Sequence, residues 1–210
     1  MITAVVLAAG AGSRLGRPKA LAVVDPPRTA LEIVVATCAA SLVDEVVVVA
    51  GARADEVVSI VSDAASRTTE VEVRCVVNAR WEEGRTGSLQ AGFAAVAAGS
   101  HVLVFPVDHP AVEIVTLDVI LGVFGYAGAA PQVVVPVLLQ DAIRRRGHPL
   151  VLGATLREAV AAMLSDEPLR DLVHRHQVLE VPVDDEAILL NVDTPEDLAR
   201  ARLLIASRRR

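Results

Sequence analysis

A glycine-rich segment near the start of the chain carries the residues best suited to bind a phosphate. From Leu7 to Lys19 the sequence reads LAAGAGSRLGRPK, in which Arg14 and Lys19 supply positive charge. Glycines let a backbone turn sharply and bring its amides close to an anion. Lys19 is the only lysine in the chain, and a lysine is a compact charge that suits a tight phosphate pocket. The segment therefore predicts a triphosphate site.

Two further places in the chain carry residues that could hold a divalent cation. Asp108 follows a predicted strand, and Asn191 and Asp193 lie two residues apart in another strand pattern, which would point both side chains to one face. Proteins hold Mg²⁺ through one or two carboxylates together with phosphate oxygens. We therefore predict Mg²⁺ as cofactor, with Asp108 as first ligand and Asp193 before Asn191 as the second. A turn or helix cap beside Pro110 is the alternative for Asp108.

The elements that must position these residues alternate regularly. Apolar runs typical of buried strands are separated by helical patterns, which predicts an α/β fold of Rossmann-like type, a mostly parallel sheet with helices on both faces. Ligands bind such sheets at the carboxyl ends of the strands. The predicted strands cover 2–9, 45–50, 71–77, 101–107, 132–137 and 187–192, and the predicted helices cover 29–41, 54–66, 86–98, 112–124 and 195–207.

Length and composition limit the class of protein. A chain of 210 residues has room for one well-buried core, so we expect a single domain over 1–210, with the less regular part, 140–180, as an insertion on the acceptor side. The net charge of −6 argues against a nucleic-acid binder. No apolar run approaches the ~18 residues of a membrane span. Since no signal peptide precedes the first strand, we expect a soluble cytoplasmic protein.

The remaining compositional features predict structural roles. Cys38 and Cys75 have no metal or redox spacing, and we expect them to be core residues without a disulfide. Arg208 to Arg210 form a basic end that we expect to be a solvated tail. The segment 194–197 has the composition of a helix start, with a capping Thr and an early Pro, so its acids are left out of the metal site.

Five motifs, in order along nearly the whole chain, resemble those of the nucleotidyltransferase superfamily that includes the molybdenum cofactor cytidylyl- and guanylyltransferases. They are L-A-A-G-x-G-x-R-x-G-x-x-K-x-L (7–21), N-x-x-W-x-x-G with S-L-x-x-G (78–92), F-P-V-D-H-P (105–110), G-H-P (147–149) and N-V-D-T-P-E-D-L (191–198). The resemblance is closest to the molybdopterin cytidylyltransferase group. Two positions depart from it, because His109 replaces the usual Gln and Asn191 the usual first Asp.

This resemblance implies transfer of a nucleotidyl group from a nucleoside triphosphate to a phosphorylated small-molecule acceptor, expected to be molybdopterin, with loss of pyrophosphate. CTP is favoured over GTP because the quartet 7–10 follows the cytidylyl branch, and a molybdoenzyme would be a further partner. Asp108 would join Arg14 and Lys19 in catalysis, and Gly147 and His148 would contact the acceptor. The nucleotide would contact Leu7, Ala8, Ala9, Gly10, Gly12, Ser13, Arg14, Lys19 and Ser88.

Three other functions stay open. An NAD(P)H-dependent oxidoreductase is supported by the Gly-x-Gly loop and by Arg53, which could meet a 2′-phosphate. Against it, Gly10, Gly12 and Gly16 do not have the spacing of a dinucleotide fingerprint. The other two are a non-catalytic chaperone that delivers a cofactor, and nucleotidyl transfer to a sugar phosphate or methylerythritol phosphate. For Ser88, a helix N-cap is as good an explanation as nucleotide contact.

Overall fold

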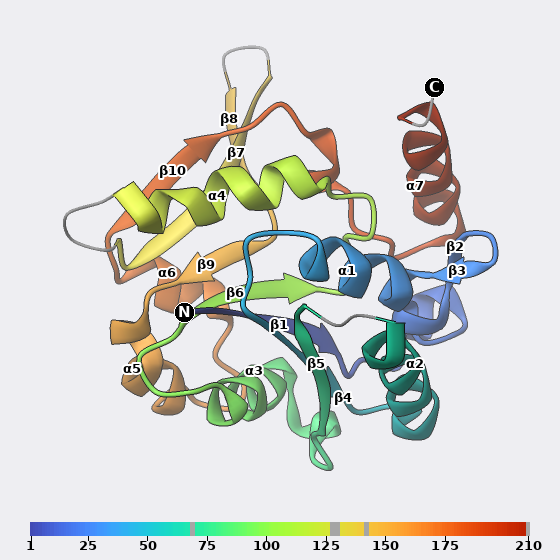
Figure 1. Ribbon diagram of the computed structural model, residues 1–210, viewed down its shortest axis with the longest axis horizontal. Helices are drawn as coiled ribbons and strands as arrows, with labels where there is room; N and C mark the ends of the chain where they lie inside the picture. The colour runs from blue at the N-terminus through green and yellow to red at the C-terminus, as the bar shows by residue number, and fades with distance from the viewer. Residues whose placement is uncertain (68–69, 127–130, 141–142, 209–210) are drawn as a thin grey trace.

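The computed structural model describes residues 1–67, 70–126, 131–140 and 143–208. The central strands in this part are β1 (Ile2–Ala8), β4 (Glu45–Ala50), β5 (Glu72–Val77), β6 (His101–Pro106), β7 (Val133–Gln140), β8 (Ile143–Arg146), β9 (Leu150–Leu152) and β10 (Val178–Pro182). They form one eight-stranded sheet of order β10-β7-β9-β6-β1-β4-β5, with β8 paired to β7 (Figure 1). A separate ribbon pairs β2 (Val23–Asp25) with β3 (Arg28–Thr29).

The sheet is mostly parallel, as the alternation of strands and helices predicted. β1 pairs in parallel with β4 and β6, β4 with β5, and β7 with β10. Only β8 and β9 run the other way among the described strands, and β9 lies between β6 and β7. The carboxyl ends of β1, β4, β6 and β7 therefore share one edge with the amino end of β9. In such sheets this edge is where ligands bind.

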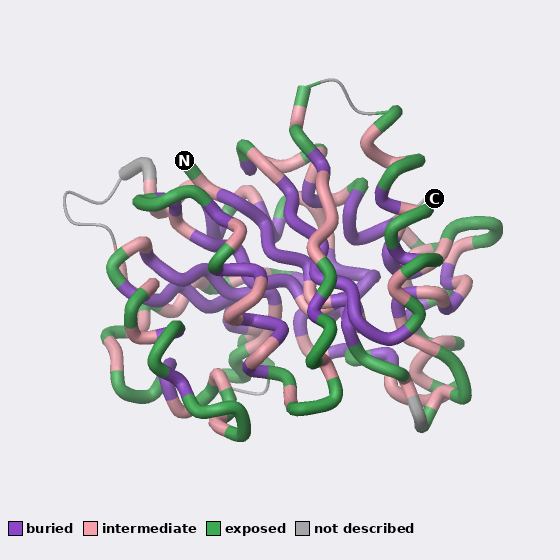
Figure 2. The backbone as a smooth tube through the Cα atoms, turned by 90° about the horizontal axis from the view of Figure 1, so that it is seen from below, coloured by how far each residue is buried: buried purple, intermediate pink, exposed green. Residues whose placement is uncertain are grey.

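Helices cover both faces of the sheet. One face carries α1 (Ala30–Ala39), α2 (Ala54–Arg67), α4 (Ile114–Tyr126) and α7 (Pro195–Ser207), and the other carries α3 (Arg85–Ala95), α5 (Arg157–Ala161) and α6 (Leu169–His174). Alternate residues of each strand serve the two layers, so Val6 packs with the first set and Val5 with the second. Buried residues are concentrated in the middle of the molecule, and exposed ones lie at its periphery (Figure 2). The predicted fold class is confirmed.

The sequence explains these elements locally. β4 reads EVVVVA, and the four valines are fully buried because a parallel strand is covered on both faces. α1 begins at a capping box of Thr29 and Glu32, and α7 begins at a second box of Thr194 and Asp197, which confirms the predicted helix start. Cys38 is buried in the core, and both cysteines are free thiols.

One predicted strand is wrong. Residues 187–192 do not join the sheet, and the segment instead opens with the 3₁₀ helix η5 (Glu186–Leu189). The Asp185 carboxylate accepts the amide of Ala187 at 3.0 Å and closes the turn, although Ile188 and Val192 are buried as a strand would bury them. The segment 140–180 supplies β8, β9, α5, α6 and the first residues of β10.

The expectation of a solvated tail is also wrong for Arg208, while residues 209–210 lie outside the described part. The Arg208 side chain is only 23% exposed and folds back over the segment that follows β6. It donates to Asp185 at 2.6 Å and to the backbone carbonyl of Ala111, and its Nε lies 3.0 Å from Glu113 Oε1. Arg208 therefore fastens the end of α7 to the body of the domain.

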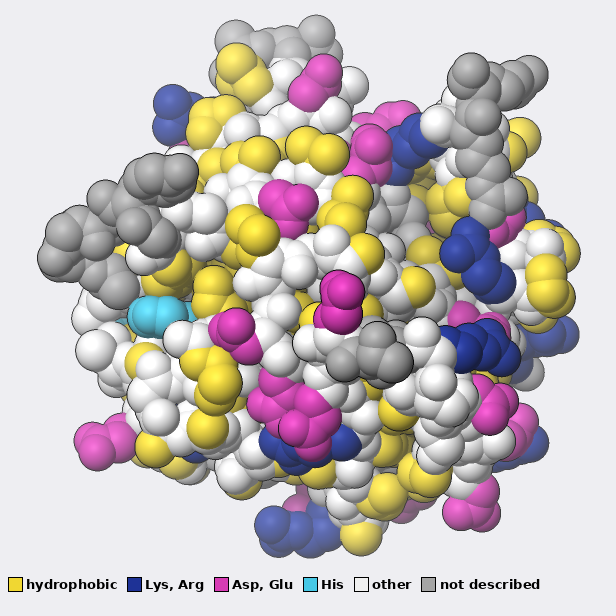
Figure 3. Space-filling view, viewed as in Figure 1, with side chains coloured by type: hydrophobic (Ala, Val, Ile, Leu, Met, Phe, Trp, Pro, Cys, Tyr) yellow, Lys and Arg dark blue, Asp and Glu magenta, His cyan; other side chains and the backbone are white. Residues whose placement is uncertain are grey.

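Two surface features complete the description. Hydrophobic side chains gather over α4, where Val115 and Val119 are exposed (Figure 3). None of the helices in the described ranges has the length and apolar character needed to cross a membrane.

Candidate functional site

Three of the predicted catalytic or metal-binding residues meet at the predicted edge of the sheet. Lys19 opens the short helix η2 (Lys19–Leu21), Asp108 follows β6, and Asp193 precedes α7. Lys19 Nζ lies 2.7 Å from Asp108 Oδ2 and also donates to Asp193 Oδ1. The fold thus brings two carboxylates from distant parts of the chain within reach of one cation.

Backbone hydrogen bonds fix the spacing of these two carboxylates. The amide of Val192 donates to the carbonyl of Asp108 at 2.8 Å. The amide of Val107 in turn donates to the carbonyl of Leu7 at 3.2 Å, which ties the Asp108 segment to the end of β1. The Asp193 amide donates to the Asn191 carbonyl at 3.1 Å, so the chain turns there. Because residues 187–192 are not a strand, the expected shared face of Asn191 and Asp193 is absent, and Asn191 is exposed.

The charges of this cluster reinforce one another. Burial alone would lower the pKa of Lys19, but the attraction of Asp108 and hydrogen bonds to both carboxylates outweigh it and raise the pKa above its usual value. The hydrogen bond from Lys19 holds the pKa of Asp193 below its usual value, and Arg14 and Arg85 add to the effect. The lysine and Asp193 are both charged at neutral pH. Arg85, at the start of α3, is a site neighbour that the sequence did not single out.

The glycine-rich loop leads directly into the cluster. Gly12 and Gly16 have positive φ angles of 66° and 72°. At Gly12 a Cβ would lie 2.0 Å from the carbonyl oxygen of Arg17, so only glycine fits where the loop folds back on itself. Arg14 lies in the short helix η1 (Ser13–Leu15), is 68% exposed, and approaches Asp193 Oδ2 at 3.5 Å. The side chain of Ser13 lies outside the described part.

The start of the loop is packed against the end of β4. Leu7 and Ala8 are the last residues of β1, and Ala9 and Gly10 follow. The carbonyl of Ala9 accepts the amide of Ala52 at 2.9 Å. A Cβ at Gly51 would lie 2.6 Å from Trp81 Cβ and 2.7 Å from Ala9 Cβ, so these backbones approach closely. Glycine is therefore required at position 51.

Ser88 is buried inside α3. Its hydroxyl accepts a hydrogen bond from the side-chain amide of Asn78 at 3.0 Å. The helix begins at Arg85 with Gly84 as N-cap, so the N-cap explanation of Ser88 is wrong. Its contact with nucleotide stays a prediction.

A pair of histidines, the buried His109 and the half-buried His148, lies beside Asp108. His109 is only 1% exposed, with Nε2 3.8 Å from Asp108 Oδ1, and its ring centre is 5.0 Å from that of His148. Gly147 lets the chain pass close to Ile188, whose carbonyl accepts the His148 amide at 2.9 Å. Burial lowers the pKa of His148 to about 4 and also lowers that of His109, so both are neutral. The sequence flagged His109 only as a departure from the family pattern, and its burial beside Asp108 depends on tertiary packing.

The donor set of the site suits a hard divalent cation. Asp108 and Asp193 offer carboxylate oxygens, and Asp108 Oδ1 is buried without a hydrogen-bond partner among the described residues. The described ranges contain no group of three or more His, Cys, Asp or Glu side chains that could hold a metal unaided. A cation here would therefore complete its shell with phosphate oxygens and water, as Mg²⁺ and its hard relatives do.

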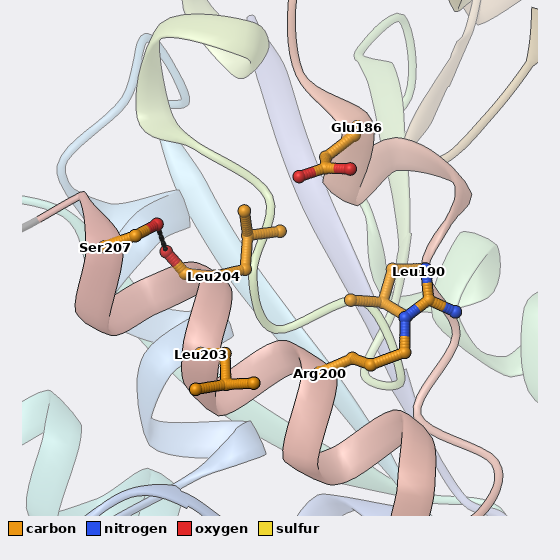
Figure 4. Close-up of a pocket in the computed structure, with 6 residues that line it drawn as sticks. All are labelled: Glu186, Leu190, Arg200, Leu203, Leu204 and Ser207. Atoms are coloured by element: carbon orange, nitrogen blue, oxygen red, sulfur yellow. Dashed lines mark hydrogen bonds between the residues drawn. The ribbon is translucent and has the colours of Figure 1, made fainter.

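A separate surface cavity of about 340 Å³ lies between η5 and α7 (Figure 4). Its lining includes none of the predicted site residues. It is lined by Glu186, Leu190, Arg200, Leu203, Leu204 and Ser207.

Comparison with known proteins identifies the family. Residues 4–181 match the MobA-like NTP transferase domain. The chain belongs to this family of nucleotidyltransferases. The resemblance drawn from the sequence motifs is thereby confirmed at the level of the family.

Among the relatives of this MobA-like chain, one is named an oxidoreductase and another a nucleotidyl transferase. Nicotine blue oxidoreductase of Paenarthrobacter nicotinovorans is 37% identical over 203 residues, which is 95% of each protein. Rv0371c of Mycobacterium tuberculosis is 31% identical with a TM-score of 0.74, covering 97% of this chain and 98% of that one. A structure of Rv0371c with manganese matches at 26% identity and TM-score 0.69, covering 96% and 98%. A nucleotidyl transferase of Methanothermobacter is 27% identical with a TM-score of 0.78, covering 99% of both chains.

Proposed function

We propose that this protein transfers a nucleotidyl group, CMP from CTP, to the phosphate of a molybdopterin-type acceptor and releases pyrophosphate. The pairing of Asp108 and Asp193 on Lys19, at the end of a glycine-rich loop, supports this proposal most. Two carboxylates and a cationic loop meeting at one strand edge are what the approach of two phosphates requires. Free thiols at both cysteines agree with a cytoplasmic location.

The residues divide the chemistry between them. Backbone amides at the start of the glycine-rich loop donate hydrogen bonds to the triphosphate, and Arg14 and Lys19 balance its charge and hold it in line for attack. Asp108 and Asp193 would hold the divalent ion, Mg²⁺ in first place, which when bound supplies positive charge to the phosphate oxygens. An oxygen of the acceptor phosphate forms a bond to the α-phosphorus, and the bond from that phosphorus to the β-phosphate oxygen breaks. The electron pair leaves with pyrophosphate.

The acceptor side would be formed by Gly147 and His148. This segment reaches Asp108 through the buried His109, so an acceptor bound there lies next to the carboxylate pair. For the base, the quartet 7–10, which resembles that of the cytidylyl branch, favours CTP over GTP.

A second candidate function is that of an NAD(P)H-dependent oxidoreductase. The name of the 37% identical relative, nicotine blue oxidoreductase, is the observation that favours it. Arg53, at the tip of β4, has a positive φ of 56° and an exposed side chain beside Glu56, and it could contact a 2′-phosphate. This alternative does not use the convergence of Asp108 and Asp193.

One experiment separates the two functions. The protein is incubated with CTP, GTP or ATP and molybdopterin, with and without Mg²⁺ or Mn²⁺, and pyrophosphate is measured. In parallel, NADH and NADPH oxidation is followed with quinone-type acceptors. We expect pyrophosphate only when CTP, acceptor and metal are all present. Metal-independent NAD(P)H oxidation without pyrophosphate release would establish the oxidoreductase instead.

A further inference from the structure

We infer that Lys19 is an exchangeable counter-ion, which fills the place of the divalent cation until metal and nucleotide arrive together. The inference rests on the proposed metal site and adds a coupling between its two ligands. It follows from where the ammonium lies, between Oδ2 of Asp108 and Oδ1 of Asp193. A metal ion bonded to the same two oxygens at about 2.1 Å would need that space.

The second oxygen of each carboxylate is less accessible to a metal ion than the two oxygens that contact Lys19. Oδ1 of Asp108 is buried and faces Nε2 of His109 at 3.8 Å. Oδ2 of Asp193 faces the guanidinium of Arg14 at 3.5 Å. A cation that arrives from solvent and binds both carboxylates must therefore displace Lys19.

Displacement without a nucleotide is unfavourable. A lysine that has lost both carboxylates would be a partly buried ammonium without a partner. A triphosphate in the adjoining loop removes this penalty, because the flexible stem of Lys19 can swing its charge onto phosphate oxygens. Metal and nucleotide should then bind cooperatively, each raising the affinity of the other by the same factor.

Lys19 also offsets the repulsion between the two carboxylates in the absence of a metal ion. Without a cation, Asp108 and Asp193 would repel each other at the distance that the backbone bond from Val192 to Asp108 imposes. The ammonium balances them, so the metal finds its two ligands already together. The same residue is thus a placeholder in the free protein and a phosphate ligand in the loaded one.

The first test measures Mn²⁺ binding by electron paramagnetic resonance of the free ion, without nucleotide. K19Q should bind Mn²⁺ at least about tenfold more tightly than the wild type, because a positive charge beside the two carboxylates is gone. K19R keeps the charge and should stay weak. R17Q is the matched control, since Arg17 is an exposed cation of the same loop, and it should change affinity by less than about twofold. Equal affinity of K19Q and wild type would overturn the inference.

The second test uses the unmodified chain, so it does not depend on the folding of a variant. Lys19 is the only lysine, so an amine reagent has two targets, Lys19 and the Met1 α-amine, which serves as internal reference. Mn²⁺ alone, at a concentration high enough to saturate this weak site, should speed acetylation of Lys19 relative to Met1, measured by mass spectrometry, because the bound ion displaces the ammonium. Adding CTP with Mn²⁺ should protect Lys19 again. An unchanged or slower rate with Mn²⁺ alone would contradict exchange.

The tests of cation exchange and the test of nucleotidyl transfer can fail independently of each other. Pyrophosphate release with no tightening in K19Q would remove the exchange and leave the transferase. Tighter Mn²⁺ binding in K19Q with no pyrophosphate release would leave the exchange and remove the transferase.

Discussion

Two clusters of acidic and basic side chains border the segment that follows β6, and they differ in how completely their polar groups are hydrogen-bonded. At its start, Asp108 shares Lys19 with Asp193. At its end, Glu113 and the buried Asp185 share Arg208. Both clusters join distant parts of the chain, yet only the first leaves binding capacity unused.

The Asp185 cluster is saturated. This carboxylate is 3% exposed and accepts the amides of Glu113 and Ala187 at 3.0 Å each, the hydroxyl of Thr116 at 2.8 Å, and the Arg208 guanidinium at 2.6 Å. An arginine fork and main-chain donors fill every lone-pair direction. Such a cluster holds η5, α4 and α7 together, and its Asp185 carboxylate has no free acceptor position for a ligand.

The Lys19 cluster is unsaturated. Asp108 Oδ1 has no hydrogen-bond partner among the described residues, and the cation is a single ammonium on a flexible stem. A charged cluster held by a single ammonium, with one carboxylate oxygen left without a hydrogen bond, is typical of a binding site, whereas a saturated cluster is typical of a structural contact. The number of unused hydrogen-bond acceptors, more than the presence of charges, therefore distinguishes the Lys19 cluster from the Asp185 cluster.

The largest expected effect comes from breaking the first cluster. D108N should lower the rate of pyrophosphate release at least about 10³-fold, because the proposed divalent cation would lose one of the two carboxylates that would hold it. The midpoint of thermal unfolding should change little. D166N, at an exposed acid, is the control and should keep full activity. Retention of activity in D108N would remove Asp108 from the mechanism.

Disruption of the Asp185 cluster should lower stability and leave cation binding unchanged. R208A should lower the free energy of unfolding by about 3 kcal/mol, because Asp185 is left buried and short of its cation. Mn²⁺ affinity of the folded protein should stay the same. Denaturant titration gives the first quantity and electron paramagnetic resonance the second. R170A, at an arginine that is 75% exposed, should cost less than about 0.5 kcal/mol.

A smaller effect should appear on acidification, and it involves a histidine beside the first cluster. His148 faces His109 and Asp108, and its pKa of about 4 in the folded chain lies below the value of an unfolded histidine. The unfolded chain therefore takes up a proton first as the pH falls, and stability should drop by about 2 kcal/mol between pH 7 and pH 5. Denaturant titrations of wild type and H148N at several pH values would show whether this slope is flatter in the variant.

The smallest expected effect is on stability at Arg14. Because this side chain is largely exposed and 3.5 Å from Asp193, R14Q should change the free energy of unfolding by less than about 0.5 kcal/mol. Its KM for CTP should nevertheless rise about tenfold, as one charge on the triphosphate is lost. A large loss of stability would make Arg14 part of the structural framework.

The sequence predicts the regular part of the fold well and the irregular part poorly. Valine-rich runs mark β1, β4 and β6 because parallel strands are buried on both faces. β9 has three residues, too few for any periodicity, and its place between β6 and β7 depends on pairing across the sheet. The segment 187–192 has strand composition, but the local bond from Asp185 to the Ala187 amide closes a turn.

The same division holds for the site. Local spacing of glycines and charges was sufficient to single out Lys19, and a strand end was sufficient for Asp108. The proximity of Arg85 to Asp193 and the burial of His109 arise only when separate elements pack. Arg208 is the reverse case, since a run of three arginines looks like a tail until Asp185 is brought against it.

The amide of Val192 belongs to no helix or strand, yet it is buried and bonded to the carbonyl of Asp108. Its hydrogen should therefore exchange with deuterium as slowly as those of the central strands. The geometry at this edge of the sheet is thus set by the peptide backbone, so side chains there can be exchanged without loss of the frame.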